Sequence, residues 1–297
     1  MPTKKLSADH IVGLMCTSIK ADDPPGLLHD VVADILVYHN IIDSYDQAFE
    51  TAETVLQSVK ELLLSRQAEA ERDGLVWSCE LYGSEDEYVR GSSFRDPTLS
   101  DEERRVRANR IHIKSAKEAL VSLTPSEFEL VCTRVLELMG CSEPKTSPIR
   151  DDGGIDFYGR LHLRGRLDSS SPLGGIDGRV NIWLLGQAKH YPKNRIQTAH
   201  VRELVGSVEL ARTGGAIHTW EGLHLRPFDA TLQLLFTTGS FTSGAERLLD
   251  KSGMISMNGD QLATFLCDAG VGVDELSNSF DSNKFREGLG IVPAAIL

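Results

Sequence analysis

The stretch that decides the fold is Val180-Asn181-Ile182-Trp183-Leu184-Leu185-Gly186-Gln187-Ala188-Lys189, an apolar run that ends in an amide and a cation. Val180 to Ala188 predicts a buried strand, and Ile155 to Leu163 predicts a second strand. The Gly- and Ser-rich residues between them predict a flexible connection, so the two strands should form a hairpin. Because side chains alternate along a strand, Gln187 and Lys189 should share one face while Ala188 points to the other.

The surrounding sequence predicts helices that alternate with further strands. Thr124 or Ser126 can cap a helix that stops at Gly140 and carries Glu129 one turn inside its start. Five more elements are expected: a helix over His200 to Arg212, a buried strand over Leu232 to Thr238, a short helix from Thr242 or Ser243 through Leu249, a strand over Met254 to Met257 and a helix over Gln261 to Cys267. We therefore expect an α/β domain with a central mixed sheet flanked by helices.

Three residue types along this pattern suit the hydrolysis of a phosphodiester. A bound Mg²⁺, with Mn²⁺ as a possible substitute, would activate water and stabilise the charge that builds on the phosphate oxygens. Hard cations take oxygen ligands, so the carboxylates of Asp156 and Glu129 and the side-chain carbonyl of Gln187 are suitable donors. Lys189 would orient the attacking water or help to deprotonate it while it neutralises charge on the phosphate.

Each of these motifs alone also has an ordinary structural interpretation. An isolated Asp-Gly-Gly is usually a turn, and an isolated Gln-x-Lys on a strand is usually a solvated face. Glu127, Glu129 and Glu137 could each be a solvent-facing residue of one helix. The ordered combination, after one helix and before another, favours a catalytic site over these separate interpretations.

Four segments in this order resemble the Mrr-type restriction endonuclease domain. They are Leu123-Thr124-Pro125-Ser126-Glu127-Phe128-Glu129, Asp152-Gly153-Gly154-Ile155-Asp156, Gln187-Ala188-Lys189 and Val201-Arg202-Glu203-Leu204-Val205-Gly206. The resemblance extends over roughly residues 120 to 272. It implies a restriction-endonuclease-like fold and membership of the PD-(D/E)xK nucleases, in the variant with Gln in place of the second acid.

The resemblance also assigns roles to particular residues. It implies that Asp156, Gln187, Lys189 and Glu129 are catalytic, with Asp156, Gln187 and Glu129 holding the metal ion. This chain departs from the family pattern in a longer stretch between Asp156 and Gln187 and in an insertion around His218 to Asp229. Both departures bear on the choice of substrate.

The charge of the chain opposes simple binding to DNA. The formal net charge is -12, and free DNA-binding domains are usually basic. Residues 1 to 120 hold 14 basic and 22 acidic residues, so the remainder, with 17 basic and 21 acidic residues, is less acidic. Five basic residues in the second half are candidates for contacts to nucleic acid, although a solvated strand face is an equal alternative for the first two: Arg160, Arg164, His190, Lys193 and Arg195. We expect weak intrinsic affinity for DNA, supplemented by a partner or an oligomer.

The expected organisation has three parts. Residues 1 to 100 contain helical stripes around Leu27 to Leu36 and Tyr45 to Arg72, which predict a small, separate N-terminal helical domain for partner binding or oligomerisation. Residues 101 to 122 predict a charged helical linker, and residues 123 to 297 the nuclease domain. No apolar run is long enough for a membrane span or a secretory signal, so the expected location is the cytoplasm.

Two functional hypotheses follow. The first is a Mg²⁺-dependent DNA endonuclease that serves as the nuclease component of a bacterial restriction or anti-phage defence system. Because no Walker motif is present in the sequence, this hypothesis expects a separate ATPase or sensor subunit. The alternative is a non-catalytic DNA-binding or assembly subunit that keeps the nuclease fold as a scaffold. The joint presence of Asp156, Gln187 and Lys189 favours the enzyme.

Overall fold

The structure is a computed structural model, and it describes residues 6–147, 154–162, 181–215 and 220–291. The chain divides into two compact units, which we describe separately. The first contains Met1–Ile113 together with the short segment Glu275–Ser279, and the second contains Lys114–Asp274 and Phe280–Leu297.

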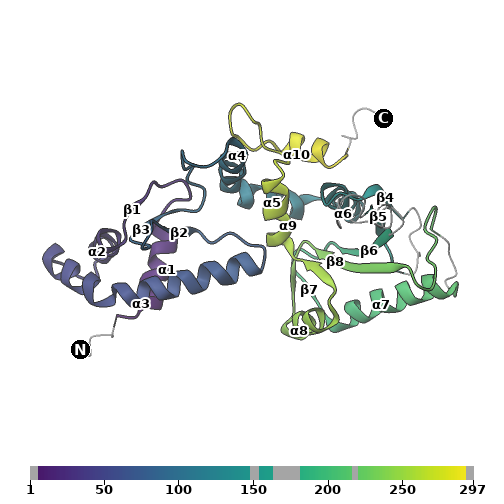
Figure 1. Cartoon of the computed structure of the whole chain (residues 1–297), viewed down its shortest axis with the longest axis horizontal. Helices are drawn as coiled ribbons and strands as arrows, with labels where there is room; N and C mark the ends of the chain where they lie inside the picture. The colour runs from purple at the N-terminus through teal and green to yellow at the C-terminus, as the bar shows by residue number, and fades with distance from the viewer. Residues whose placement is uncertain (1–5, 148–153, 163–180, 216–219, 292–297) are drawn as a thin grey trace, which may run out of the picture. The chain divides into compact units, whose positions relative to one another are not determined.

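The first unit is built on three helices and a small sheet (Figure 1). The helices α1 (Ala8–Ser18), α2 (Leu28–Tyr38) and α3 (Tyr45–Arg72) bury an apolar core that includes Met15, Leu36 and Val59. The α2 and α3 helices were predicted from their apolar periodicity. The antiparallel sheet, in the order β1 (Gly26–Leu27), β3 (Tyr88–Gly91), β2 (Cys79–Tyr82), was not predicted, and β3 lies in a stretch expected to be a loop.

The segment expected to be one charged linker helix contains three elements. These are α4 (Asp101–Asn109), a 3₁₀ turn over Arg110–His112 and α5 (Ile113–Ser122). Ser100 and Glu103 form a reciprocal capping box at the start of α4, which satisfies two main-chain N–H groups. The unit boundary at Ile113 falls at the beginning of α5.

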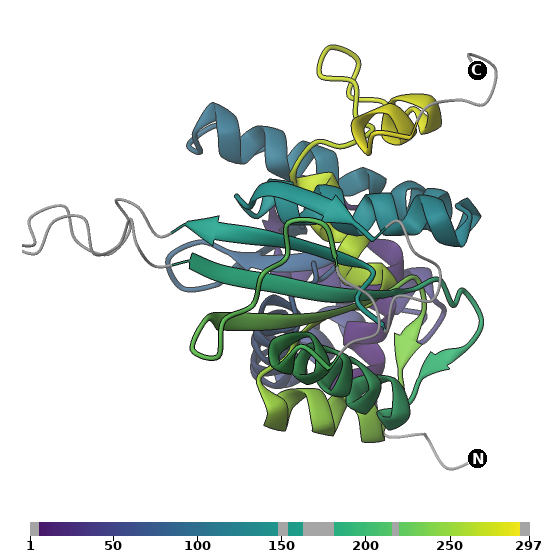
Figure 2. The same cartoon turned by 90° about the vertical axis from the view of Figure 1, so that its right-hand side faces the viewer.

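The second unit has the predicted central mixed sheet. Its five strands follow the order β10-β8-β6-β5-β4, seen nearly face on in Figure 2. They are β4 (Ser142–Thr146), β5 (Phe157–His162), β6 (Asn181–Lys189), β8 (Ala230–Thr237) and β10 (Ile255–Met257). β5 runs antiparallel to both of its neighbours, β4 and β6, whereas β6, β8 and β10 are mutually parallel. The antiparallel pairing of β5 and β6 is therefore confirmed, whereas the flexible connection predicted between them lies outside the described residues. Edge strand β4 was not predicted.

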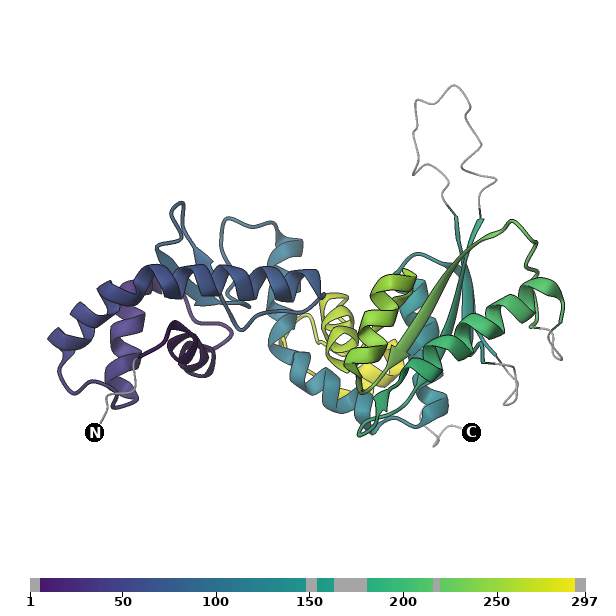
Figure 3. The same ribbon diagram turned by 90° about the horizontal axis from the view of Figure 1, so that it is seen from below.

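Helices cover both faces of this sheet (Figure 3). They are α6 (Pro125–Leu138), α7 (Thr198–Thr213), α8 (Ser243–Ser252) and α9 (Gly259–Asp268). A further helix, α10 (Ser282–Gly288), was not predicted and lies next to α6. Tyr158 of β5 shares a buried cluster with Leu204 of α7, whereas the neighbouring Gly159 faces Leu136 of α6. Because successive strand residues face opposite ways, α6 and α7 cover opposite faces. A short parallel pair, β7 (Arg195–Ile196) and β9 (Ser240–Phe241), completes the unit.

The start of α6 is fixed by an acid that links two parts of the second unit. Thr124 is the N-cap, and its main-chain N–H donates to the Glu127 carboxylate at 2.7 Å. Arg286 of α10 pairs with the same carboxylate. The N–H bond from Thr124 is the largest cause that lowers the pKa of Glu127, and the Thr124 hydroxyl and Arg286 act in the same direction. The folded state therefore favours the ionised form of Glu127.

This lowered pKa predicts how stability depends on pH. The stabilisation is fully present above the ordinary glutamate pKa of about 4.3 and is lost as pH falls through the lower pKa of the folded state. We expect Glu127→Gln to be less stable than wild type in urea unfolding at about pH 6, and the difference to shrink at about pH 3. An equal difference at both pH values would show that the charge of Glu127 contributes nothing.

Gly186 lies at a position in the β5–β6 hairpin where there is no space for a side chain. It lies opposite Phe157 in the strand register, and a Cβ at Gly186 would lie 2.0 Å from the Phe157 ring. The ring is buried and stacks on Phe236 with 5.3 Å between centroids, so it has no space to withdraw.

We expect Gly186→Ala to destabilise the protein by about 2 kcal/mol in chemical unfolding, since overpacking a dense core costs roughly 1–3 kcal/mol. Gly206→Ala is the matched control, because Gly206 lies within α7 and a Cβ there would meet no atom within 4 Å. That control should be neutral or stabilising by up to about 1 kcal/mol. Equal stability of both variants would contradict the packing argument.

Candidate active site

Strand pairing brings Asp156 and Gln187 to one end of the sheet. Phe157 pairs with Gly186, and the Asp156 N–H donates to the Gly186 carbonyl oxygen at 2.9 Å. The Ala188 N–H in turn donates to Asp156 Oδ2 at 2.7 Å. Hydrogen bonds to the main chain of Gly186 and of Ala188 therefore fix Asp156 directly across from Gln187. Residues that face each other across an antiparallel pair project to the same face of the sheet.

Gln187 is buried, with 1% of its surface exposed. Its Nε2 donates to Glu203 Oε1 of α7 at 3.4 Å, a long hydrogen bond. Its Oε1 is buried and accepts no hydrogen bond from the residues that the structure describes. A buried acceptor without a donor costs free energy, and a bound cation is one way to satisfy it.

Gly154 holds the other side of the Gln187 amide. The residue has φ +90°, and a Cβ there would lie 2.7 Å from Ser207 Oγ and 3.2 Å from Gln187 Nε2. The left-handed conformation and the close approach both require glycine. Gly154 thus allows α7 and Gln187 to pack against the chain just before Asp156.

Lys189 extends from the same face of β6 as Gln187 and meets the same carboxylate. Its Nζ lies 3.9 Å from Glu203 Oε1, and 18% of its side chain is exposed. Its main-chain oxygen accepts a hydrogen bond from Thr237 Oγ1 at 2.8 Å, which ties the end of β6 to β8. One oxygen of Glu203 therefore contacts both the amide and the ammonium group.

Glu203 is a site residue that sequence reasoning did not select. It belongs to the Val201–Gly206 segment that resembles the family, but the resemblance assigns it no role. Half of its side chain is exposed, in contrast to the apolar neighbours Val201 and Leu204, which are buried on the same helix. A charged residue between two core positions, on the helix after Gln-x-Lys, was the available signal.

Glu129 approaches from α6, on the opposite face of the sheet. The pKa of the buried Cys132 thiol, one turn further along α6, indicates where the Glu129 carboxylate lies. Burial is the main cause that raises the pKa of Cys132, and the negative charges of Asp156 and then Glu129 raise it further. Both carboxylates therefore lie near this thiol. The direct contacts with Glu203, by contrast, join only Gln187 and Lys189.

The residues predicted to contact nucleic acid do not cluster around Gln187 and Lys189. Arg160 pairs with Glu143 at 3.4 Å and lies over the Trp183 ring. His190 faces away from Lys189, with its ring 5.9 Å from that of Phe128 and its Nε2 buried. The predicted contacts that remain exposed are Lys193 and Arg195, on the segment between β6 and α7, whereas Arg164 lies outside the described residues.

The chemistry of the donor set fits a hard divalent cation. Over residues 6–147, 154–162, 181–215 and 220–291, no three His, Cys, Asp or Glu side chains gather as a metal-binding group. The group around Gln187 instead combines a carboxylate with an amide oxygen that has no donor. Carboxylate and amide oxygens are ligands that Mg²⁺ and Mn²⁺ accept, so the residues present are compatible with either ion.

The class of the second unit follows from a comparison with protein-family models. Residues 120–266 match the family model Mrr_cat, described as a restriction endonuclease. This segment of the chain is therefore a restriction endonuclease domain of the Mrr type, and the recognition made from the sequence is confirmed. Domains of this family cleave DNA. A search of curated proteins found no match.

Solved structures similar to this chain include three restriction endonucleases. MspJI in complex with a 27-mer oligonucleotide is 20% identical over 73% of this chain and 41% of that chain, with a TM-score of 0.39. The DNA modification-dependent restriction endonuclease AspBHI is 17% identical over 66% of this chain and 43% of that chain, with a TM-score of 0.37. FokI bound to DNA is 10% identical over 89% of this chain and 44% of that chain, with a TM-score of 0.33. This chain thus spans less than half the length of each of them.

Proposed function

We propose that this protein is a metal-dependent DNA endonuclease whose active site comprises Asp156, Gln187, Lys189 and Glu129. The observation that carries the proposal is the buried Oε1 of Gln187, which has no donor among the described residues and lies on the strand end where Asp156 and Lys189 converge. Asp156, Gln187 and Glu129 would hold the ion. A bound Mg²⁺ or Mn²⁺ supplies an activated water and neutralises charge on the phosphate.

The remaining chemistry belongs to side chains of this chain. Lys189 places an ammonium group where the scissile phosphate would bind, so it orients the attacking water and stabilises the charge that develops on the phosphate oxygens. Glu203 is a positioning residue, because its Oε1 holds both Gln187 Nε2 and Lys189 Nζ. This arrangement turns the amide oxygen of Gln187 away from Glu203.

The role of Glu203 can be tested separately from that of the catalytic residues. We expect Glu203→Gln to retain the fold and to lower the rate of DNA cleavage about 10–100-fold, as is typical for residues that orient metal ligands. A glutamine can still accept from Gln187, whereas it cannot balance the Lys189 charge. The difference should therefore appear in the pH profile of cleavage as well as in its rate. An unchanged rate and profile would remove Glu203 from the site.

We place this nuclease in the cytoplasm, as the cleaving component of a bacterial restriction or anti-phage defence system. The net charge of -12 supports dependence on a second component, because an acidic protein attracts DNA poorly at long range. Residues 1–100 would recruit that component, an ATPase or sensor subunit, or form an oligomer. No helix among the described residues is long and apolar enough to span a membrane.

The decisive experiment is cleavage of supercoiled plasmid by the purified chain with Mg²⁺ or Mn²⁺ at low salt. We expect nicked or linear products that disappear with EDTA and with Lys189→Ala. Low salt offsets the acidic balance, since the affinity of proteins for DNA falls steeply with salt concentration. Products that persist with EDTA would contradict a metal-dependent site.

The absence of cleavage would favour the alternative of a binding or assembly subunit that keeps the fold as a scaffold. Metal binding by the same preparation separates the two explanations. A chain that binds Mn²⁺ through Asp156 but does not cleave awaits its partner, whereas a chain that binds no metal is a scaffold.

A further inference from the structure

The first unit contains a second concentration of positive charge, far from the nuclease residues in sequence. Residues 1–89 hold six basic and 17 acidic residues, whereas residues 90–110 hold six arginines and four acidic residues. Two of these arginines are structural. Arg90 pairs with Glu80 and Asp96 at 2.8 Å each, and Arg107 donates to the Phe94 carbonyl oxygen at 2.8 Å.

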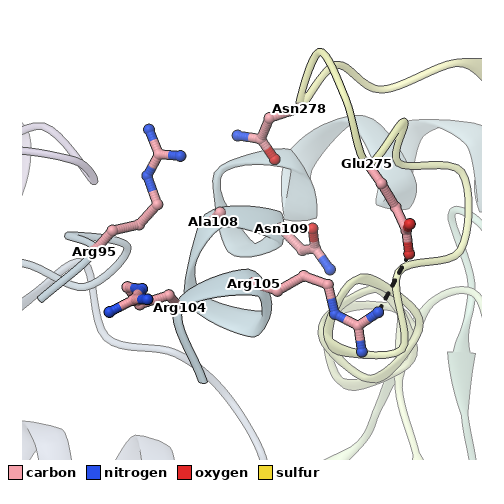
Figure 4. Close-up of a pocket in the computed structure, with 7 residues that line it drawn as sticks. All are labelled: Arg95, Arg104, Arg105, Ala108, Asn109, Glu275 and Asn278. Atoms are coloured by element: carbon pink, nitrogen blue, oxygen red, sulfur yellow. Dashed lines mark hydrogen bonds and ion pairs between the residues drawn. The ribbon is translucent and has the colours of Figure 1, made fainter. Parts of the chain in front are cut away.

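Three other arginines of this stretch line one cavity of about 550 Å³ (Figure 4). The polar residues around it are Arg95, Arg104, Arg105, Asn109, Glu275 and Asn278, all within the first unit. No aromatic side chain is among the lining residues. The volume is in the range that accommodates a small organic ligand, and the polar groups favour an anion.

The guanidinium groups differ in how far they are already engaged. Arg104 donates to the main-chain oxygens of Pro97 and Leu99 at 2.9 and 2.8 Å, so its fork is held in place. Arg105 pairs with Glu275 at 3.2 Å and with Glu102 at 3.1 Å. Arg95, by contrast, is exposed and has no ion pair among the described residues.

Two amides complete the cavity. Asn109 is 4% exposed, and it lines the cavity. Asn278 lies across from it, in a left-handed conformation with φ 47°, and its carbonyl oxygen accepts from His112. In Figure 4 the Asn109 amide lies between the arginines of α4 and the Glu275–Ser279 segment. Amide groups that line a cavity beside arginines offer neutral hydrogen-bond donors to an anion.

We propose that this cavity binds a phosphate group, carried either by the backbone of DNA or by a free nucleoside phosphate. Guanidinium forks match phosphate oxygens, and amide N–H groups add neutral donors. Glu275 does not exclude this ligand, since its side chain is 77% exposed and ion pairs at the surface are weak. A phosphate can therefore replace the carboxylate on Arg105. The absence of aromatic side chains leaves the phosphate as the recognised group.

The test compares Arg95→Gln/Arg105→Gln with wild type and with Arg72→Gln. The double variant leaves Arg104 and its main-chain contacts intact. Arg72 is an exposed arginine of the same unit, 73% accessible in its side chain, that does not line the cavity. Binding is measured with fluorescent duplex DNA in EDTA, where metal-dependent cleavage is blocked, and with ATP by calorimetry.

If DNA is the source, the double variant should bind duplex about tenfold more weakly, and its salt dependence should become shallower by about one unit for each lost phosphate contact. If a free nucleotide is the source, ATP affinity should fall by a similar factor while duplex binding stays unchanged. Arg72→Gln should match wild type in both assays. Unchanged binding of both probes by the double variant, or no binding of either by wild type, would overturn the proposal.

Only the binding of DNA by this cavity rests on the proposed nuclease function. The phosphate site and the nuclease activity can therefore be disproved separately. Metal-dependent plasmid cleavage by a double variant that binds both probes normally would remove the phosphate site and leave the nuclease. Selective loss of ATP binding in the double variant, with a wild type that neither cleaves DNA nor binds Mn²⁺, would leave the phosphate site and remove the nuclease.

Discussion

Lys189→Ala is expected to lower the rate of DNA cleavage about a thousandfold and to leave the fold intact. A group aimed at the charge that develops in the transition state contributes roughly 10²–10³-fold, and alanine removes both this charge stabilisation and the orientation of the attacking water. The side chain contributes little to stability, because its one ion pair, to Glu203, spans 3.9 Å and Glu203 is half exposed. Unfolding curves of variant and wild type should therefore overlap.

Plasmid cleavage at saturating metal is the appropriate measurement, because the loss should not be recovered at higher metal concentration. Lys251→Ala is the matched control, since Lys251 is an exposed lysine in the last turn of α8 in the same unit. It should cleave at the wild-type rate. A Lys189→Ala protein that cleaves as fast as Lys251→Ala would show that the catalytic cation lies elsewhere.

The sheet of the nuclease unit could be predicted from sequence because its central strands are apolar and end at polar motifs. Residues 183–187 of β6 and 234–237 of β8 are buried on both faces, and strands of this kind form apolar runs. β4 was missed because Ser-Glu-Pro-Lys-Thr has no apolar residue, and proline is tolerated at a sheet edge. The two-residue strands β7 and β9 carry too few side chains to show any period.

The candidate site could be predicted where it depends on strand register. Asp156 opposite Gln187 follows from a hairpin, and Lys189 on the face of Gln187 follows from alternation. Glu203 could not be found in this way, because its contacts depend on how α7 rotates over the sheet. The arginine cavity was also beyond prediction, since Glu275 and Arg105 are joined by the tertiary fold across a long stretch of chain.

The net charge of the chain does not show how its charged residues are distributed in the structure. Sequence counts suggested a uniformly acidic N-terminal half, yet three arginines face one cavity there. A net charge controls attraction at a distance, whereas a local cluster controls contacts at close range. An acidic nuclease can therefore depend on a few concentrated cations, which would make its DNA affinity strongly dependent on salt.

The second large effect is expected for Asp156→Asn. Asparagine has nearly the same shape, and its Oδ1 can still accept the Ala188 N–H, so the strand end should remain folded. The substitution removes the negative charge that favours a divalent cation. Changes to residues that merely orient metal ligands cost about 10–100-fold, so loss of a direct ligand should reduce cleavage by more than about a hundredfold.

Metal binding provides a measurement that does not depend on catalysis. A ligand that binds only the folded state stabilises it by about 2.7 kcal/mol at a concentration of 100 times its Kd. Wild type should therefore unfold at a higher temperature when Mn²⁺ is added, and Asp156→Asn should lose most of that increase. Asp250→Asn, at an exposed acid of α8, should keep it. If Asp156→Asn gains as much stability from Mn²⁺ as wild type does, the ion is held by other residues and the buried oxygen of Gln187 must have a different partner.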